Sequence, residues 1–237
     1  MTISRRSVLL NAAGMISAGT ILRAQEPGPR APEEFTLEID AVPLDVERPI
    51  RVAATASAPT DCQVQVLTNN NQPAYPPRDW SLTPKQAFSL EARLERAAGA
   101  NGYTVRAKMR PQQGAHPSMG FAITQDGGVT EDQLRQMAIE VPFIDDPAKG
   151  PGRFKVEVFE PSKIETKIWS GTIAKGSPLY TDTLSNIAKG SNPIPWDLKA
   201  KGKAGKVPAG PYLAWLTCTP NNSQRRPTHY FASFSVI

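Results

Sequence analysis

Residues 196–212 read WDLKAKGKAGKVPAGPY, and this stretch carries most of what the sequence says about the fold. It begins with a large aromatic residue and a turn-forming aspartate, and it returns through Val-Pro-Ala-Gly-Pro to Tyr212. Proline presets φ, and Gly210 can adopt a positive φ where a tight turn demands it. The stretch therefore predicts a hairpin connection between two strands, with the ring of Tyr212 facing inward and its hydroxyl near the corner.

Four lysines lie within this connection: Lys199, Lys201, Lys203 and Lys206. On a loop tip, lysines keep a protein soluble and discourage pairing at a sheet edge. A nucleic-acid site would need interleaved aromatic side chains or a helix with one basic face, and no aromatic residue lies between Trp196 and Tyr212. We therefore expect no nucleic-acid partner, and we interpret the lysines as a candidate surface for an acidic partner.

The spacing of residues on both sides of the lysines resembles an immunoglobulin or fibronectin-like module. This module occurs in the flagellar hook-capping protein and is attached to many secreted bacterial proteins. That module ends a strand in Trp-Asp-Gly, continues through a glycine loop and returns through Val/Leu-Pro-x-Gly-x-Tyr. The matching positions are Trp196, Asp197, Gly205, Val207, Pro208, Gly210 and Tyr212, whereas Leu198 stands where the module usually has glycine. The resemblance covers about residues 153–218. It implies a sandwich in which these positions are structural, and it implies no particular function.

Alternating apolar and polar residues predict strands on both sides of this stretch. The predicted strands cover residues 35–39, 50–56, 62–67, 88–94, 103–109, 153–158, 164–169, a segment near 184, 194–196, 212–218 and 230–236. Residues 69–78 and 112–128 are instead rich in Pro, Asn, Gly and Gln, which predicts irregular loops.

One short helix is predicted near residues 130–138. Thr130 can cap it, and Gln133 follows three residues later, as in a capping box. Leu134 and Met137 give this helix an apolar edge.

These elements predict an all-β protein of two immunoglobulin/fibronectin-like β-sandwich domains in tandem. The first domain would span residues 34–144 and the second residues 153–237, joined by a linker at 145–152. A chain of 237 residues with 40% hydrophobic residues can bury such cores, and 23 dispersed prolines and 17 glycines supply frequent turns.

The N-terminus predicts export. Arg5 and Arg6 precede a charge-free, moderately apolar run of 16 residues, and the small residue Ala24 follows it. A stable transmembrane helix needs roughly 20 residues, so the run is short for a membrane anchor.

The paired arginines resemble the twin-arginine class of signals, which export folded proteins, although Val8 replaces the usual aromatic residue. We expect a signal over residues 1–24, a proline-rich leader over residues 25–33 and a periplasmic or extracellular location. An uncleaved signal would instead associate the protein with the membrane.

Charge is divided unevenly along the chain. Removing residues 1–24 removes three of the 27 basic residues and leaves 24 against 22 acidic residues, a net charge of +2. Residues 25–149 then carry a net −5 and residues 150–237 a net +7. The two halves either complement one another or present a basic face to an acidic partner, and the first interpretation is favoured.

Catalytic motifs are absent from the sequence. It contains no Gly-x-Ser-x-Gly elbow, no His-Glu-x-x-His and no glycine-rich phosphate loop. Cys62 and Cys218 fit separate buried thiols, one disulfide or a shared metal site, and we favour buried thiols. His116 and Met119 form a speculative metal pair in a predicted loop.

We therefore expect an exported, non-catalytic binding or structural protein without a cofactor, serving as an accessory subunit of a cell-envelope complex. One alternative is a periplasmic metal-handling or redox protein that uses Cys62, Cys218, His116 and Met119. Another is an enzyme whose site lies in the predicted loop at residues 112–128.

Overall fold

A computed structural model describes residues 34–99, 101–112, 117–140, 143–144, 152–222 and 224–236. The strands are β1 (Phe35–Val42), β2 (Ile50–Ala56), β3 (Thr60–Leu67), β4 (Pro73–Leu82), β5 (Phe88–Ala92), β6 (Tyr103–Pro111), β7 (Met119–Thr124), β8 (Phe143–Ile144), β9 (Arg153–Val158), β10 (Ser162–Ser170), β11 (Ile173–Ala174), β12 (Tyr180–Ile187), β13 (Gly190–Pro195), β14 (Gly210–Pro220) and β15 (Thr228–Val236). One helix, α1 (Glu131–Glu140), lies among the described residues. The predicted all-β class is confirmed.

Several sequence predictions fall outside the described residues: the export signal with Arg5 and Arg6, the leader, His116 and nearly all of the predicted linker. Within the described part of the chain, no helix has both the length and the apolar character that crossing a membrane requires.

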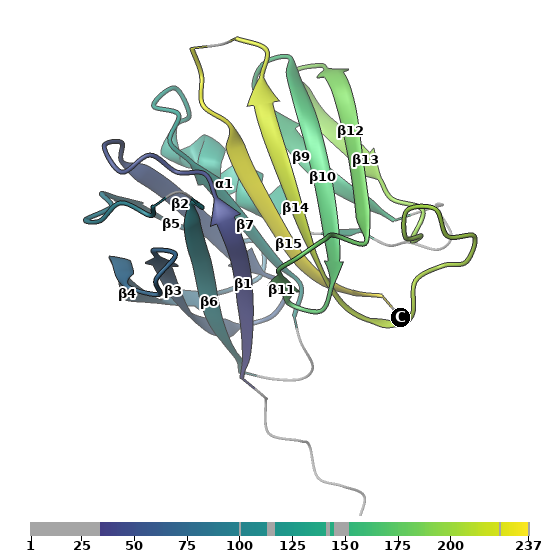
Figure 1. Ribbon diagram of the computed structural model, residues 1–237, viewed down its shortest axis with the longest axis horizontal. Helices are drawn as coiled ribbons and strands as arrows, with labels where there is room; N and C mark the ends of the chain where they lie inside the picture. The colour runs from purple at the N-terminus through teal and green to yellow at the C-terminus, as the bar shows by residue number, and fades with distance from the viewer. Residues whose placement is uncertain are drawn as a thin grey trace, which may run out of the picture.

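The molecule has three layers (Figure 1). A five-stranded sheet in the order β11-β1-β6-β3-β4 packs on one face of a seven-stranded central sheet in the order β12-β10-β14-β15-β7-β2-β5. The third layer consists of α1 and the small sheet β13-β9-β8, and it packs on the other face of the central sheet. Two hydrophobic cores result. The first core lies between the five-stranded sheet and the central sheet, and the second core lies between the central sheet and the third layer.

The central sheet joins the two halves of the chain. β7 from the first half pairs with β15 from the second, with Phe121 opposite Phe231. β1 also pairs in parallel with β11. The expected tandem of separate sandwiches is therefore revised, because each half supplies strands to a shared sheet instead of closing its own. Alternation along a strand identifies the buried face but does not identify the neighbouring strand.

The predicted loop at 112–128 is partly wrong, because Met119–Thr124 forms the fully buried strand β7. Phe121 and Ile123 face the first core, and Ala122 faces the second. A strand buried on both faces shows no alternation of apolar and polar residues. Glycines and a proline on either side completed the loop-like pattern.

The predicted loop at 69–78 is also partly wrong, because β4 begins at Pro73. This strand lies at the edge of the five-stranded sheet. Proline lacks the N–H that a central strand must donate, but an edge strand tolerates it.

The local contacts of the connection before β14 form as predicted, but the connection is not a hairpin, because β13 lies in the small sheet and β14 lies in the central sheet. Trp196 is buried, and its Nε1 donates to the carbonyl of Lys199 at 3.0 Å. The Tyr212 hydroxyl donates to the carbonyl of Pro208 at 2.7 Å, and Gly210 has a φ of 143°. Leu198 adopts a φ of 60°, the left-handed conformation that glycine occupies without steric cost.

The helix prediction is confirmed together with its capping box. The Thr130 N–H donates to Gln133 Oε1 at 2.8 Å, and the Gln133 N–H donates to Thr130 Oγ1 at 3.3 Å. Leu134 and Met137 are buried in the second core.

Candidate functional site

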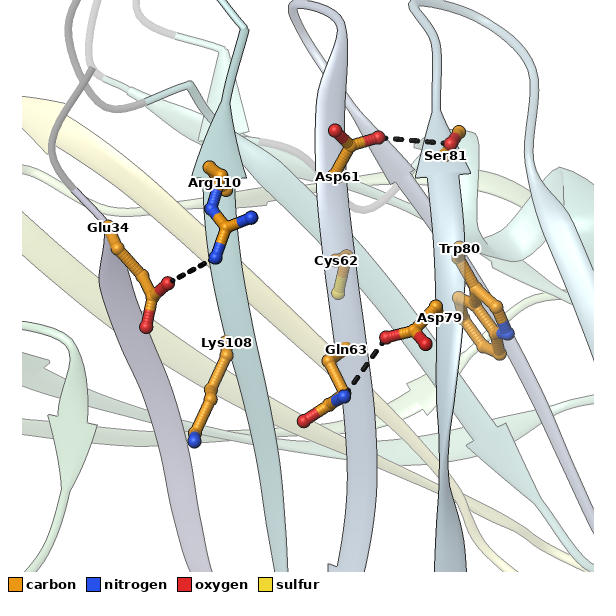
Figure 2. Close-up of a pocket in the computed structure, with 9 residues that line it drawn as sticks. All are labelled: Glu34, Asp61, Cys62, Gln63, Asp79, Trp80, Ser81, Lys108 and Arg110. Atoms are coloured by element: carbon orange, nitrogen blue, oxygen red, sulfur yellow. Dashed lines mark hydrogen bonds and ion pairs between the residues drawn. The ribbon is translucent and has the colours of Figure 1, made fainter. Parts of the chain in front are cut away.

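The outer face of the five-stranded sheet carries polar side chains in rows that cross three strands, β6, β3 and β4. In one row Asp61 of β3 lies opposite Arg110 of β6 and Ser81 of β4. In the next row Gln63 lies opposite Lys108 and Asp79. Because side chains alternate along a strand, these residues point away from the core while their neighbours face inward. We call this surface, lined by Glu34, Asp61, Gln63, Asp79, Ser81, Lys108 and Arg110, the outer face (Figure 2).

The first row is held by direct contacts. Arg110 Nη2 lies 3.0 Å from Glu34 Oε2, and the Ser81 hydroxyl donates to Asp61 Oδ1 at 3.0 Å. Such cross-strand pairs stabilise a sheet by roughly 0.2–1 kcal/mol each. Asp61 receives neutral donors only and forms no ion pair with any described residue.

The second row contains a free cation. Gln63 Nε2 donates to Asp79 Oδ1 at 3.0 Å, so this carboxylate also has a neutral partner. Lys108 is exposed on β6, the middle strand of the sheet, and it forms no ion pair with the described residues. Its ammonium group can therefore meet an external acceptor without first breaking an internal pair.

The outer face is hollowed by about 530 Å³ along these rows. It offers one free ammonium group together with two carboxylates, Asp61 and Asp79, that no cation of the described chain neutralises. A surface with unpaired charges of both signs can bind a partner that presents complementary charges.

Cys62 lies between Asp61 and Gln63 but turns inward and is buried in the first core. Burial, followed by the negative charge of Asp79, raises the pKa of this thiol to about 12. Burial likewise raises the pKa of Cys218, which lies in the second core. Both cysteines are free, as the favoured interpretation predicted, and protonated buried thiols are neither nucleophiles nor good metal ligands.

The predicted metal pair is not brought together in the described structure. Met119 is fully buried in the first core, and His116 lies outside the described residues. No group of three or more His, Cys, Asp or Glu side chains with metal-binding geometry occurs in the part of the chain that the structure describes.

The four predicted lysines lie together on the connection between β13 and β14. Lys199 pairs with Asp197 of the same connection at 3.6 Å. Lys201, Lys203 and Lys206 are exposed and form no ion pair with the described residues. They therefore stay a candidate surface for an acidic partner.

Other cations join the acidic first half to the basic second half. Among the described residues, three pairs cross between the halves: Lys155 with Glu140, Arg225 with Asp126 and Arg226 with Asp45. Charge complementarity within the chain is therefore observed, and it does not involve the lysines of the β13–β14 connection.

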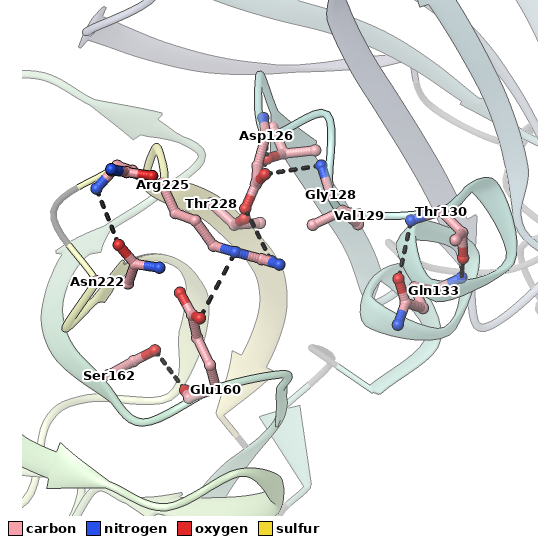
Figure 3. Close-up of polar contacts among 12 residues, drawn as sticks. Asp126, Gly128, Val129, Thr130, Gln133, Glu160, Ser162, Asn222, Arg225 and Thr228 are labelled. Carbon is pink, nitrogen blue, oxygen red and sulfur yellow. Dashed lines mark hydrogen bonds and ion pairs between the residues drawn. The ribbon is translucent and has the colours of Figure 1, made fainter.

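Arg225 forms a clasp between three segments that are distant in sequence (Figure 3). Its guanidinium lies 3.4 Å from Asp126 Oδ2, in the connection between β7 and α1, and 3.5 Å from Glu160 Oε2, between β9 and β10. Asp126 Oδ1 also accepts the Gly128 N–H at 2.8 Å. The Asp126 side chain is only 10% exposed, so it depends on these partners.

Replacing Arg225 with alanine is expected to lower the free energy of unfolding by about 2 kcal/mol, because two largely buried carboxylates lose their cation. Urea denaturation of the purified variant measures this loss. Arg226→Ala is the matched control, because the Arg226 side chain is 50% exposed and its one ion pair with a described residue, Asp45, is 3.7 Å long. Equal losses in the two variants would show that the clasp does not stabilise the fold.

The sequence alone did not identify the outer face, although it indicates which side chains of β3 point outward. The alternation that buries Cys62 and Val64 also turns Asp61 and Gln63 outward. The position of β6 between β1 and β3 was not visible, since it depends on pairing between distant strands.

No protein-family model matches the chain, and no curated protein matches it. Among solved structures, the chain is similar to a β-glucuronidase from Ruminococcus gnavus, in its apo form and in complexes with N1-substituted and C6-substituted uronic isofagomine. In each case the identity is 12%, the TM-score is 0.24, and the match covers 87% of this chain. It covers 37% of the chain in the N1-substituted complex and 36% in the other two, so the chain spans little more than a third of the enzyme's length. A likeness of this size assigns no activity.

Proposed function

We propose that the protein is an exported, non-catalytic binding protein that acts as an accessory subunit of a cell-envelope complex and docks its partner on the outer face. The observation that carries this proposal is the free ammonium group of Lys108 on the middle strand of a hollowed polar sheet. The paired arginines near the N-terminus support export.

The partner that fits best is a polypeptide surface with charges of both signs. A partner carboxylate would pair with Lys108, and partner cations would pair with Asp61 and Asp79, whose present donors are neutral. Complementary charges of this kind set specificity and speed association. Glu34 and Arg110 are already paired and would shape the rim of the contact.

Lys108→Glu is expected to weaken capture of the native partner at least tenfold, because an attractive contact becomes a repulsive one. The affinity-tagged full chain is isolated from native envelope fractions, and co-purifying chains are quantified by mass spectrometry. Lys163→Glu is the matched control, since Lys163 is an exposed lysine of β10 without an ion pair to the described residues.

The lysines of the β13–β14 connection provide a competing docking surface within the same experiment. A variant with Lys201, Lys203 and Lys206 replaced by glutamate should keep the partner if the outer face is the site. Loss of the partner in this variant, together with retention in Lys108→Glu, would move the site to the connection. A protein that elutes as a bare monomer from every native fraction would contradict the accessory role.

A further inference from the structure

A second hollow, of about 450 Å³, opens at one end of the first core. It lies where the chain leaves β1 and where β15 begins, and its lining includes Leu44, Asp45, Gly102, Gln125, Arg226 and His229. None of these residues belongs to the outer face. Its volume falls within the range of roughly 300–1,000 Å³ that is typical of small-molecule sites.

His229 is a buried residue, 2% exposed, in the wall of this hollow. Trp215 Nε1 lies 3.2 Å from His229 Nδ1. An indole N–H can only donate, so Nδ1 must accept, and the proton of the neutral ring must sit on Nε2. Thr217 Oγ1 lies 3.4 Å from the same Nδ1, and its hydroxyl can donate to it in this tautomer.

The Nε2 atom of His229 has no hydrogen-bond partner among the described residues. His229 is one of the residues that line the hollow, so a ligand in the hollow would lie beside its ring. Burial, followed by the positive charge of Lys167, lowers the pKa of His229 to about 4. At neutral pH the ring therefore presents a neutral N–H donor in a fixed direction.

Two guanidinium groups share one carboxylate beside the hollow. Arg48 Nε and Arg226 Nη2 both approach the same oxygen, Asp45 Oδ2, at 3.5 and 3.7 Å. Both contacts are longer than a charge-assisted hydrogen bond, and Arg226 is half exposed, so its guanidinium keeps donors for another anion. Gln125 fixes the Asp45 backbone, because its amide accepts from the Asp45 N–H and donates to the Asp45 carbonyl, each at 2.7 Å.

We propose that this hollow binds a small organic carboxylate, whose anionic group accepts from His229 Nε2–H and pairs with Arg226. Pro43, Leu44 and Pro227 line the same hollow and would contact the apolar body of the ligand. The combination of an apolar wall with a few convergent polar groups is the usual composition of a small-molecule site. Such a ligand would supply the acceptor that the buried histidine lacks.

Benzoate is the probe, and the indole N–H signal of Trp215 is the reporter, because this group is bonded directly to His229. The chain has four tryptophans, so its NMR spectrum holds few indole signals to assign. Titration of the purified protein with sodium benzoate should shift the Trp215 signal saturably. Arg226→Gln should weaken binding at least tenfold through loss of a charge-assisted contact. Arg78→Gln, an exposed arginine on the edge strand β4, should leave binding unchanged.

Sodium chloride and inorganic phosphate are titrated in parallel at matched ionic strength. Chloride should produce no saturable shift, and phosphate should bind more weakly than benzoate because it gains nothing from the apolar wall. The proposal is overturned if benzoate gives no saturable shift, if phosphate binds more tightly, or if Arg226→Gln binds benzoate as well as the unmodified protein does. Because Arg226 is half exposed, a failure of Arg226→Gln to bind would not reflect loss of the fold.

Discussion

Trp196→Ala is expected to lower the free energy of unfolding by about 3–5 kcal/mol, the usual range for truncating a buried aromatic residue. Trp196 is 1% exposed and fills the second core. Its ring centroid lies 5.8 Å from that of Tyr212 and 5.9 Å from that of Phe234, both in edge-on geometry. Truncation also removes the Nε1 donor from the Lys199 carbonyl, which loosens the connection to β14.

Chemical denaturation followed by circular dichroism measures this loss. Trp80→Ala is the control, because Trp80 lies on the edge strand β4 and is only partly buried, so its truncation should cost much less. Trp196→Phe keeps part of the packing, so its loss of unfolding free energy should fall between those of Trp196→Ala and Trp80→Ala. This milder variant keeps the test informative if Trp196→Ala does not fold, since many domains have only about 5–15 kcal/mol of stability. Equal losses for Trp196→Ala and Trp80→Ala would contradict the central role of Trp196.

The elements that sequence predicted correctly depend on contacts between near neighbours. The capping box joins Thr130 to Gln133, and the Tyr212 hydroxyl bonds to Pro208 four residues away. Strand alternation is equally local, and it placed β2 at its observed bounds. Interactions between residues that are close in sequence can be predicted from one amino-acid sequence.

The missed features depend on long-range pairing. β7 was hidden because it is covered on both faces, by the first core at Phe121 and by the second at Ala122. The shared central sheet follows from the pairing of Phe121 with Phe231, which are more than a hundred residues apart. Nothing in the sequence of either strand identifies the strand with which it pairs. The order of the predicted strands along the chain therefore suggested separate sandwiches.

The outer face and the hollow beside His229 also depend on contacts between residues that are distant in sequence, which one sequence does not reveal. Lys108 is one of many lysines in the sequence, and it becomes distinctive only because Arg106 and Arg110 on the same strand are ion-paired while it is not. No motif in the sequence singles out His229. Its fixed tautomer depends on Trp215, fourteen residues earlier on a neighbouring strand.

His229 should make the protein less stable as the pH falls from about 6.5 to about 4. The pKa of its imidazole is lowered from 6.5 to about 4 in the folded state, first by burial and then by the positive charge of Lys167. Below about pH 6.5 the imidazole binds a proton in the unfolded chain but stays neutral in the folded chain. The free energy of unfolding therefore decreases as the pH is lowered. Above this range the residue contributes no pH dependence, and at about pH 4 the full loss is about 3 kcal/mol.

Denaturation curves at several pH values between 7 and 4 measure this loss, with His229→Gln as the reference. Glutamine can accept from the Trp215 indole N–H but does not titrate, so the difference between the two pH profiles isolates the imidazole from the carboxylates that titrate in both proteins. Lys167→Met should reduce the difference, because removing the nearby positive charge lets the pKa of His229 rise toward 6.5. Parallel pH profiles for the unmodified protein and His229→Gln would mean that folding does not lower the pKa of this ring, in which case the folded ring would be protonated below about pH 6.5 and Nδ1 could not accept from Trp215 there.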